Sequence, residues 1–247
     1  MKLDLVIARS TNKTLYRDGN RLIKVFDEGT PNYEVFKEVL NHTSVESIGV
    51  NVPELLEVTR VDGKWVITCQ FISGKTLEEL INENPEKKDE YLEILVNVQM
   101  QIQSKSSNRL TPIKEVLHDK IRLTAYNATT RYELHNDIDA MPRSSTVCHC
   151  DLIPSSIIVA DSGEYYVVSW AHATRGYFLA DVATTYLLLL INGDSEGADK
   201  YLDLFASKSG IEKAVIENLI PTMAATLICD CEEDKKQILF SLVNKAY

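Results

Sequence analysis

The chain has 247 residues, 45% of them hydrophobic and 25% charged, which is the composition of an ordinary globular protein large enough for two lobes. The formal net charge of −10 argues against nucleic acid and anionic membrane surfaces as partners, because both require clustered lysine and arginine. The longest apolar run, YLLLLI at residues 186–191, is far shorter than the roughly 20 residues that a bilayer span needs. The sequence therefore predicts a buried helix there and no membrane partner.

Alternating apolar residues and turn residues predict that the N-terminal part of the chain is a set of strands around one helix. The strands are expected at residues 3–8, 14–26 and 54–72. The last two segments are predicted to be hairpins, because Asp18-Gly19-Asn20 and Asp62-Gly63 are typical turn sequences. Residues 33–49 have the apolar spacing of a helix, with Gly49 as its stop.

From residue 76 onward the apolar period is that of helices. Thr76 and Glu79 have the spacing of a capping box, which predicts the start of a short helix. Longer helices are expected at residues 89–104, 112–140 and 179–245. The chain is therefore predicted to be an α+β protein with a β-rich lobe at 1–72 and a mainly helical lobe at 73–247, which binds its ligand between the lobes.

The five cysteines are an odd number in a chain without a visible secretory signal, which predicts reduced thiols in a cytoplasm. Two Cys-x-Cys pairs occur, Cys148 with Cys150 and Cys229 with Cys231. Zinc sites usually leave two or more residues between paired ligands, so the pairs are interpreted as buried thiols that pack like small apolar residues.

The segment 147–170 carries the strongest motif in the chain. It leads from a short strand into HCDLIPSSI, and a strand pair then ends at Ser169-Trp170. This sequence resembles the H-G-D-x-x-P-x-N-[IV] loop of the aminoglycoside phosphotransferase and choline kinase-like family, which is related to the protein kinases. The resemblance covers nearly the whole chain. It implies a two-lobed protein-kinase-like fold, ATP as cofactor and phosphorylation of a small-molecule hydroxyl, with Asp151 as the base that receives the hydroxyl proton.

The resemblance also implies roles for residues of the first lobe. Lys24, near the end of a hairpin strand, would hold the phosphates of the nucleotide. An acid of the following helix would hold this lysine in place; Glu38 is the first choice, and Glu34, one turn earlier on the same face, is the alternative. Gln70 and Ile72 lie where the family's chain approaches the hinge, and are expected to contact the nucleotide.

Two further residues are expected to support the loop. The resemblance implies that His149 holds the loop in place and that Asp181, at the start of a buried helix, braces it through backbone amides. The chain lacks a glycine-rich phosphate loop, and a polar turn at residues 9–13 is a weak candidate for phosphate contacts in its place.

Three residues of the loop and strand pair depart from the family pattern. Ser156 stands where the family has a metal-binding asparagine, and Ser169 stands where it has a metal-binding aspartate. Cys150 replaces the glycine before Asp151. Loss of the carboxylate predicts weakened Mg²⁺ binding and a rate loss on the order of a thousandfold.

These departures favour a pseudokinase that binds a nucleotide, a small molecule or another protein. Two alternatives stay open. In the first, the chain is an active atypical small-molecule kinase that uses Asp151 as base and holds its metal mostly through ATP, Asp151 and the two serines. In the second, it is a ligand-binding module that captures a cation without nucleotide. The sequence does not identify the acceptor.

Overall fold

The computed structural model describes residues 5–10 and 12–247. Its architecture is α+β, with a five-stranded antiparallel sheet formed by the N-terminal part of the chain and a mostly helical C-terminal part. The predicted fold class is therefore confirmed. The strand expected at residues 3–8 is present as β1, Leu5–Ser10, while residues 3 and 4 lie outside the described part.

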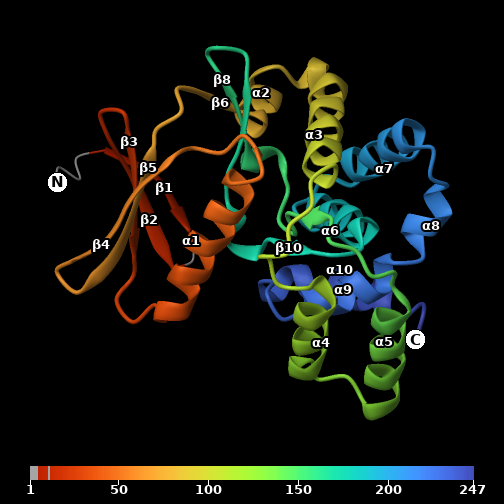
Figure 1. Cartoon of the computed structure of the whole chain (residues 1–247). Coiled ribbons are helices and arrows are strands. Elements are labelled where there is room, and N and C mark those ends of the chain that lie inside the picture. Colours follow the sequence, from red (N-terminus) through yellow and green to blue (C-terminus); the bar gives the residue numbers. More distant parts are fainter. Residues whose placement is uncertain (1–4, 11) are drawn as a thin grey trace. The chain divides into compact units, whose positions relative to one another are not determined.

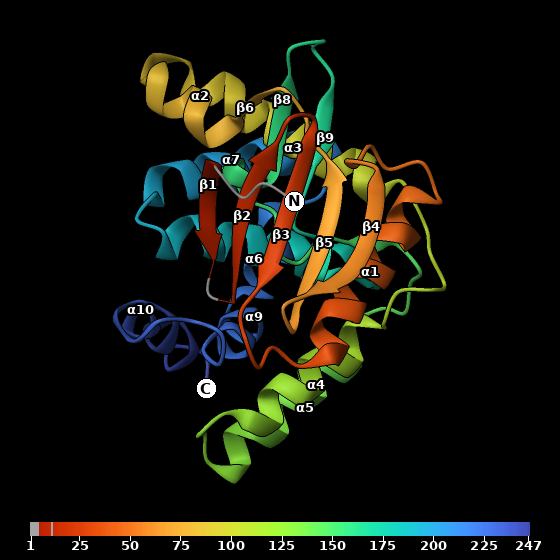
Figure 2. The same ribbon diagram turned by 90° about the vertical axis from the view of Figure 1, so that its left-hand side faces the viewer.

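The five strands of the sheet lie side by side in the order β1-β2-β3-β5-β4 (Figure 2). The remaining strands are β2, Lys13–Asp18; β3, Arg21–Phe26; β4, Leu55–Val61; and β5, Lys64–Gln70. Both predicted hairpins are formed, by β2 with β3 and by β4 with β5. Asp62 and Gly63 connect β4 to β5 with positive φ angles of 50° and 82°, as a tight hairpin turn requires.

Helix α1, Asn32–Glu46, is held to the sheet by a small apolar core. The core consists of Phe26, Val35, Ile67 and Cys69, with Val39, Leu55, Val58 and Trp65 packed against it. Because Val35 comes from α1 and the others mostly from β3, β4 and β5, burial of these side chains determines which face of α1 meets the sheet. The helix ends at Glu46, three residues before the predicted stop at Gly49.

The chain forms two compact units. The first contains the residues up to Leu77 together with Ser155–His172, and the second contains Glu78–Pro154 and Ala173–Tyr247. In this grouping the strand pair that follows the loop belongs to the N-terminal unit, and the expected lobe boundary at residue 72 stays a prediction. The physical reason for the grouping is long-range strand pairing, which turn and periodicity signals do not reveal.

A short strand that the sequence reading missed makes this pairing. Strand β6, Gly74–Thr76, pairs with β8, Ile157–Ala160, which in turn pairs with β9, Tyr165–Val167. In addition, the backbone N–H of Val167 donates to the carbonyl of Asn51 at 2.9 Å. The strand pair of the motif is thus built into the first unit.

Gly74 is required where β6 meets β8. Its φ is +155°, and an added Cβ would lie 2.2 Å from the carbonyl oxygen of Val159. We expect Gly74→Ala to lower the free energy of unfolding by about 3 kcal/mol, since the two backbones cannot separate without losing their pairing. Gly163→Ala is the matched control: its φ is also positive, +86°, but nothing lies within 4 Å, so a loss of about 1 kcal/mol is expected. Equal losses in urea denaturation would contradict the steric argument.

The second unit is mainly helical, as predicted. Its helices are α2, Leu77–Glu83, which begins at the last residue of the first unit; α3, Lys88–Gln103; α4, Ile113–Leu123; α5, Ala128–Ala140; α6, Phe178–Ile191; α7, Ser195–Ser209; α8, Lys213–Glu217; α9, Ile220–Leu227; and α10, Glu233–Val243. Two short strands, β7, Val147–Cys148, and β10, Thr174–Arg175, pair with each other. Short 3-10 helices occur at Pro85–Lys87, Pro154–Ser156 and Trp170–His172.

Helix α6 forms the centre of the second unit. It packs against α7 and α9 (Figure 1), and most of its residues are buried, including the apolar run predicted to be a core helix. Within residues 5–10 and 12–247, no helix has the length and apolar character needed to cross a membrane.

All five cysteines are free. Cys69 and Cys148 are buried, as expected for thiols that pack like apolar residues, and Cys150 is partly buried. The expectation was wrong for Cys229, whose position after α9 leaves it exposed. Among the described residues, no group of three or more His, Cys, Asp and Glu side chains is arranged to hold a metal ion.

Candidate functional site

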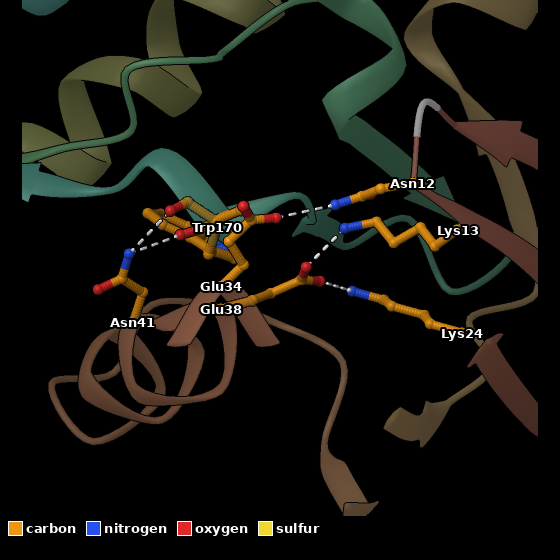
Figure 3. A network of polar contacts seen from close by, with 8 residues as sticks. Asn12, Lys13, Lys24, Glu34, Glu38, Asn41 and Trp170 are labelled. Atoms are coloured by element: carbon orange, nitrogen blue, oxygen red, sulfur yellow. Dashed lines mark hydrogen bonds and ion pairs between the residues drawn. The ribbon is translucent and has the colours of Figure 1, made fainter. Parts of the chain in front are cut away.

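A buried carboxylate between two lysines is the main polar feature of the first unit. The Lys24 Nζ lies 2.7 Å from Glu38 Oε1, and the Lys13 Nζ lies 2.5 Å from Glu38 Oε2. Of the two acids considered from the sequence, Glu38 is therefore the one that pairs with Lys24. Glu34 instead accepts a hydrogen bond from the Asn12 side chain at 3.4 Å (Figure 3).

The register of the first hairpin explains why both lysines reach the same acid. Lys13 pairs with Phe26 across β2 and β3, and Lys24 lies two residues before Phe26 on the same strand. Side chains directly opposite each other, and those two residues away, share one face of a sheet. Both lysines therefore project toward α1, where Glu38 lies. Lys13 also lies over the Phe26 ring, 5.1 Å from its centroid.

The charges of this cluster stabilise one another in a largely buried place. The side chains of Lys13, Lys24 and Glu38 are 17%, 11% and 5% exposed. Burial by itself raises the pKa of Glu38, but attraction to Lys24 and Lys13 outweighs it and lowers that pKa to about 2. Burial lowers the pKa of Lys24 while the charge of Glu38 raises it, and the raising prevails. Lys24 and Glu38 are thus both ionised near neutral pH.

Helix α1 also holds the segment that follows Ser169. The Asn41 side chain, one turn after Glu38, donates to the backbone carbonyls of Trp170 at 3.1 Å and of Ala171 at 3.2 Å. The indole N–H of Trp170 donates to the carbonyl of Val167 at 3.0 Å. The same helix therefore positions the lysine pair and the end of the strand pair (Figure 3). Sequence reasoning missed Asn41 and included Lys13 only as part of the polar turn at residues 9–13, although hairpin register and helix spacing are the signals that find their contacts.

The two serines of the motif have different surroundings. Ser156 is buried, 3% exposed, and its carbonyl accepts from the N–H of Val168 at 2.9 Å. Ser169 is exposed and has a φ of +70°, a left-handed conformation that aspartate and asparagine adopt more readily than serine. Neither side chain brings a negative charge to its position.

Gln70, the last residue of β5, and Ile72, two residues after it, differ in exposure. Gln70 is exposed, and its backbone N–H donates to the carbonyl of Glu54 at 2.8 Å. Ile72 is buried, 8% exposed. The predicted contacts of both residues with a nucleotide stay predictions. Of the polar turn at residues 9–13, Thr11 and the side chain of Ser10 lie outside the described part.

In the second unit, the loop residues before Pro154 are held by short-range contacts. His149 is fully buried, and its Nδ1 accepts a hydrogen bond from the backbone N–H of Asp151 at 3.2 Å. This geometry fixes the imidazole with an unprotonated Nδ1. The Asp151 side chain is partly exposed.

Asp181 is the acceptor at the centre of a buried hydrogen-bond network in the second unit. Its Oδ1 accepts from the backbone N–H of Cys150 at 2.7 Å, and it also accepts from the backbone of His149. Its Oδ2 accepts from the side-chain amides of Gln99 and Gln103, each at 3.2 Å. Burial raises the pKa of Asp181, and these four donors oppose the increase. The network joins α3 and α6 to the loop.

Cys150, which stands in the place of the loop glycine, keeps a backbone conformation typical of glycine. Its φ is +61°. The thiol lies 3.1 Å from the Thr174 hydroxyl, and burial, with the charge of Asp181, raises its pKa to about 12. The raised pKa favours the neutral thiol near neutral pH, whereas the thiolate is the nucleophilic form.

The residues expected to act together are distributed over both units. Lys24, Glu38, Ser156 and Ser169 belong to the first unit. His149, Asp151 and Asp181 belong to the second. Each unit thus contains one organised part: a charged cluster on α1 and the sheet in the first, and a braced loop in the second.

These features define the class of fold, which is the protein-kinase-like fold of aminoglycoside phosphotransferases and choline kinases. No protein-family model matches the chain, and no curated protein matches its sequence.

Particular solved structures are similar over almost the whole chain. One is a thermostable mutant of aminoglycoside phosphotransferase APH(4)-Ia in ternary complex with AMP-PNP and hygromycin B, with a TM-score of 0.70 and 13% identity over 98% of this chain and 91% of that one. Choline kinase LicA from Streptococcus pneumoniae has a TM-score of 0.59 and 16% identity, over 99% of this chain and 94% of that one. A choline/ethanolamine kinase family protein from Mesorhizobium loti has a TM-score of 0.57 and 12% identity, over 95% and 86%. At these identities the similarity establishes the fold alone.

Proposed function

We propose that the protein is an aminoglycoside phosphotransferase-like nucleotide-binding protein whose phosphoryl transfer to a small-molecule hydroxyl is impaired. The buried pair of Lys24 and Glu38 carries this proposal. A lysine fixed by a helix carboxylate is the arrangement with which kinase-type folds position the phosphates of ATP. The free thiols are those of a protein that works in a reducing cytoplasm.

The donor groups present do not fit the magnesium ions of such a fold. Mg²⁺ is held by carboxylates and phosphate oxygens, and the two positions that would supply protein ligands carry Ser156 and Ser169. A hydroxyl supplies no negative charge. We therefore assign no catalytic step to a metal. When bound, ATP would supply the transferable phosphoryl group, and Lys24 would hold its phosphates.

The loop of the second unit retains what a proton acceptor needs. Asp151 is partly exposed, its backbone is held by His149, and the preceding residue is held by Asp181. In the proposed ancestral reaction this carboxylate would take the proton of the acceptor hydroxyl. The presence of Asp151 also supports the alternative function, an active small-molecule kinase with unusual metal chemistry.

Nucleotide binding tests the proposal directly. We expect ATP to raise the melting temperature of the wild-type protein in the presence of EDTA. At about 100 times the Kd, ligation adds about 2.7 kcal/mol, which shifts Tm by about 5–10 °C in a chain of this size. Lys24→Met is expected to abolish most of the shift, whereas Lys64→Met, an exposed lysine of the same sheet, is expected to keep it.

The outcomes separate the candidate functions. No shift at millimolar ATP, with or without Mg²⁺, would refute nucleotide binding and leave the nucleotide-independent module. Rapid Mg²⁺-dependent phosphorylation of a small hydroxylated compound by the wild-type protein would refute the impairment and establish the active kinase.

A further inference from the structure

We propose that Lys13 is a second phosphate-binding cation, which replaces the charge of the magnesium ion and lets this protein bind a nucleoside triphosphate without metal. The inference rests on the proposed nucleotide function and adds a specific residue and ligand form to it. It is carried by the contacts of Glu38 with two lysines rather than one.

Lys13, Lys24 and Glu38 form a cluster with more positive than negative charge. A single lysine paired with a single glutamate positions a phosphate but has no net positive charge. Here Lys13 and Lys24 share one carboxylate, so the cluster carries one net positive charge. Glu34, one helical turn before Glu38, accepts a hydrogen bond from the side chain of Asn12 at 3.4 Å. His42, also near Lys24, has its pKa lowered by burial and by the charge of Lys24, so it stays neutral and adds no charge near neutral pH.

The net charge of this cluster can be compared with that of a metal-dependent kinase-type site. Kinase-type sites combine a Lys–Glu pair with an aspartate that carries a magnesium ion. The aspartate and the dication together contribute one net positive charge. In this chain Ser169 removes the carboxylate, and Lys13 contributes one positive charge from the neighbouring strand. Lys13 therefore matches the net charge of this one aspartate–magnesium pair without a metal, while the charge of the second magnesium ion of kinase-type sites has no counterpart.

Lys13 is placed to exchange its contact with Glu38 for a contact with a phosphate. Its side chain is 17% exposed, more than those of Lys24 and Glu38, and it occupies the first position of β2. An ammonium group bound to a shared carboxylate can turn to a phosphate oxygen and leave Glu38 paired with Lys24. The Phe26 ring lies 5.1 Å from the Lys13 Nζ, and an apolar surface beside an ammonium group strengthens its charge interactions. A merely structural lysine would stabilise Glu38 and leave nucleotide affinity unchanged.

Isothermal titration of ATP at constant ionic strength, in EDTA and in Mg²⁺, distinguishes the two roles. We expect wild-type protein to bind ATP in EDTA at least as tightly as it binds MgATP, since magnesium neutralises charge that Lys13 would otherwise meet. Lys13→Met is expected to weaken ATP binding in EDTA by about tenfold or more, as loss of a charge-assisted hydrogen bond does. Lys13→Arg should retain affinity within a few-fold, and Lys64→Met should equal wild type.

Each result decides between the proposals. Wild-type binding that requires Mg²⁺, or Lys13→Met binding in EDTA as tight as that of wild type, would overturn the role of Lys13 and leave the proposed function standing. Absence of ATP binding by wild type in both buffers would overturn the proposed function itself. Thermal unfolding of Lys13→Met and Lys13→Arg shows whether each variant is folded, and the arginine variant keeps the test decisive if the methionine variant is not.

Discussion

Replacing Ser169 with aspartate and Ser156 with asparagine is expected to raise Mg²⁺-dependent ATP turnover by about a thousandfold. The aspartate would return a full negative charge to the position where kinase-type sites hold a dication, and the asparagine would return a carbonyl ligand. The backbone at Ser169 favours this change, because its φ of +70° is one that aspartate tolerates better than serine. Turnover is measured as phosphate release under saturating ATP and Mg²⁺.

The matched control is the same double variant with Asp151→Asn added. If the restored turnover proceeds through the loop, removal of the Asp151 carboxylate should return it to the wild-type level. A wild-type protein that already hydrolyses ATP as fast as the double variant would show that the serines do not limit the chemistry. An increase that survives Asp151→Asn would show that the new activity arises elsewhere.

Truncating Asp181 is expected to lower the free energy of unfolding by about 3 kcal/mol, measured by urea denaturation. Asp181 is fully buried and accepts from the backbone of Cys150 and from the side chains of Gln99 and Gln103. Asp181→Ala leaves these donors without their acceptor and opens a cavity between α3, α6 and the loop. The reason for the large effect is the desolvation of unpaired donors and not the loss of a net charge.

Two variants sharpen this test. Asp181→Asn keeps the volume and one acceptor oxygen, so its free energy of unfolding should lie between those of wild type and Asp181→Ala. Asp203→Ala removes an acid from α7 whose partner, Lys213 at 2.7 Å, is partly solvated, and a change within about 0.5 kcal/mol is expected. A loss from Asp181→Ala as small as that from Asp203→Ala would refute the bracing role.

Local signals in the sequence were sufficient for the secondary structure near the site. The turns at Asp62-Gly63 and around Gly19 specify their hairpins, because few other residues adopt positive φ without strain. Helical periodicity located α3, since burial of one face repeats with the turn of the helix, whereas the apolar run at residues 186–191 indicated the buried helix α6. Strand β6 was missed because three residues are too few to show a period.

Contacts between distant residues were only partly predictable. That an acid of α1 would meet Lys24 follows from the resemblance, yet the sequence left Glu38 and Glu34 as alternatives on one helix face. The structure decided for Glu38 because packing of Val35 against Phe26 sets the rotation of α1 over the sheet. The partnership of Asp181 with Gln99 and Gln103 has no local signal, since those residues lie 82 and 78 positions away.

The sequence by itself determined the α+β class and the order of most elements, because these depend on residue type and short-range spacing. It also shows serine at positions 156 and 169, where the family that it resembles has metal ligands. Only the tertiary structure decided that Lys13 joins Lys24 on Glu38 and that Asn41 holds the segment after Ser169. It also decided that the strands after the loop belong with the N-terminal unit. The physical reason is that strand register and helix rotation are set by burial of whole faces, which places charges together that are far apart in the chain.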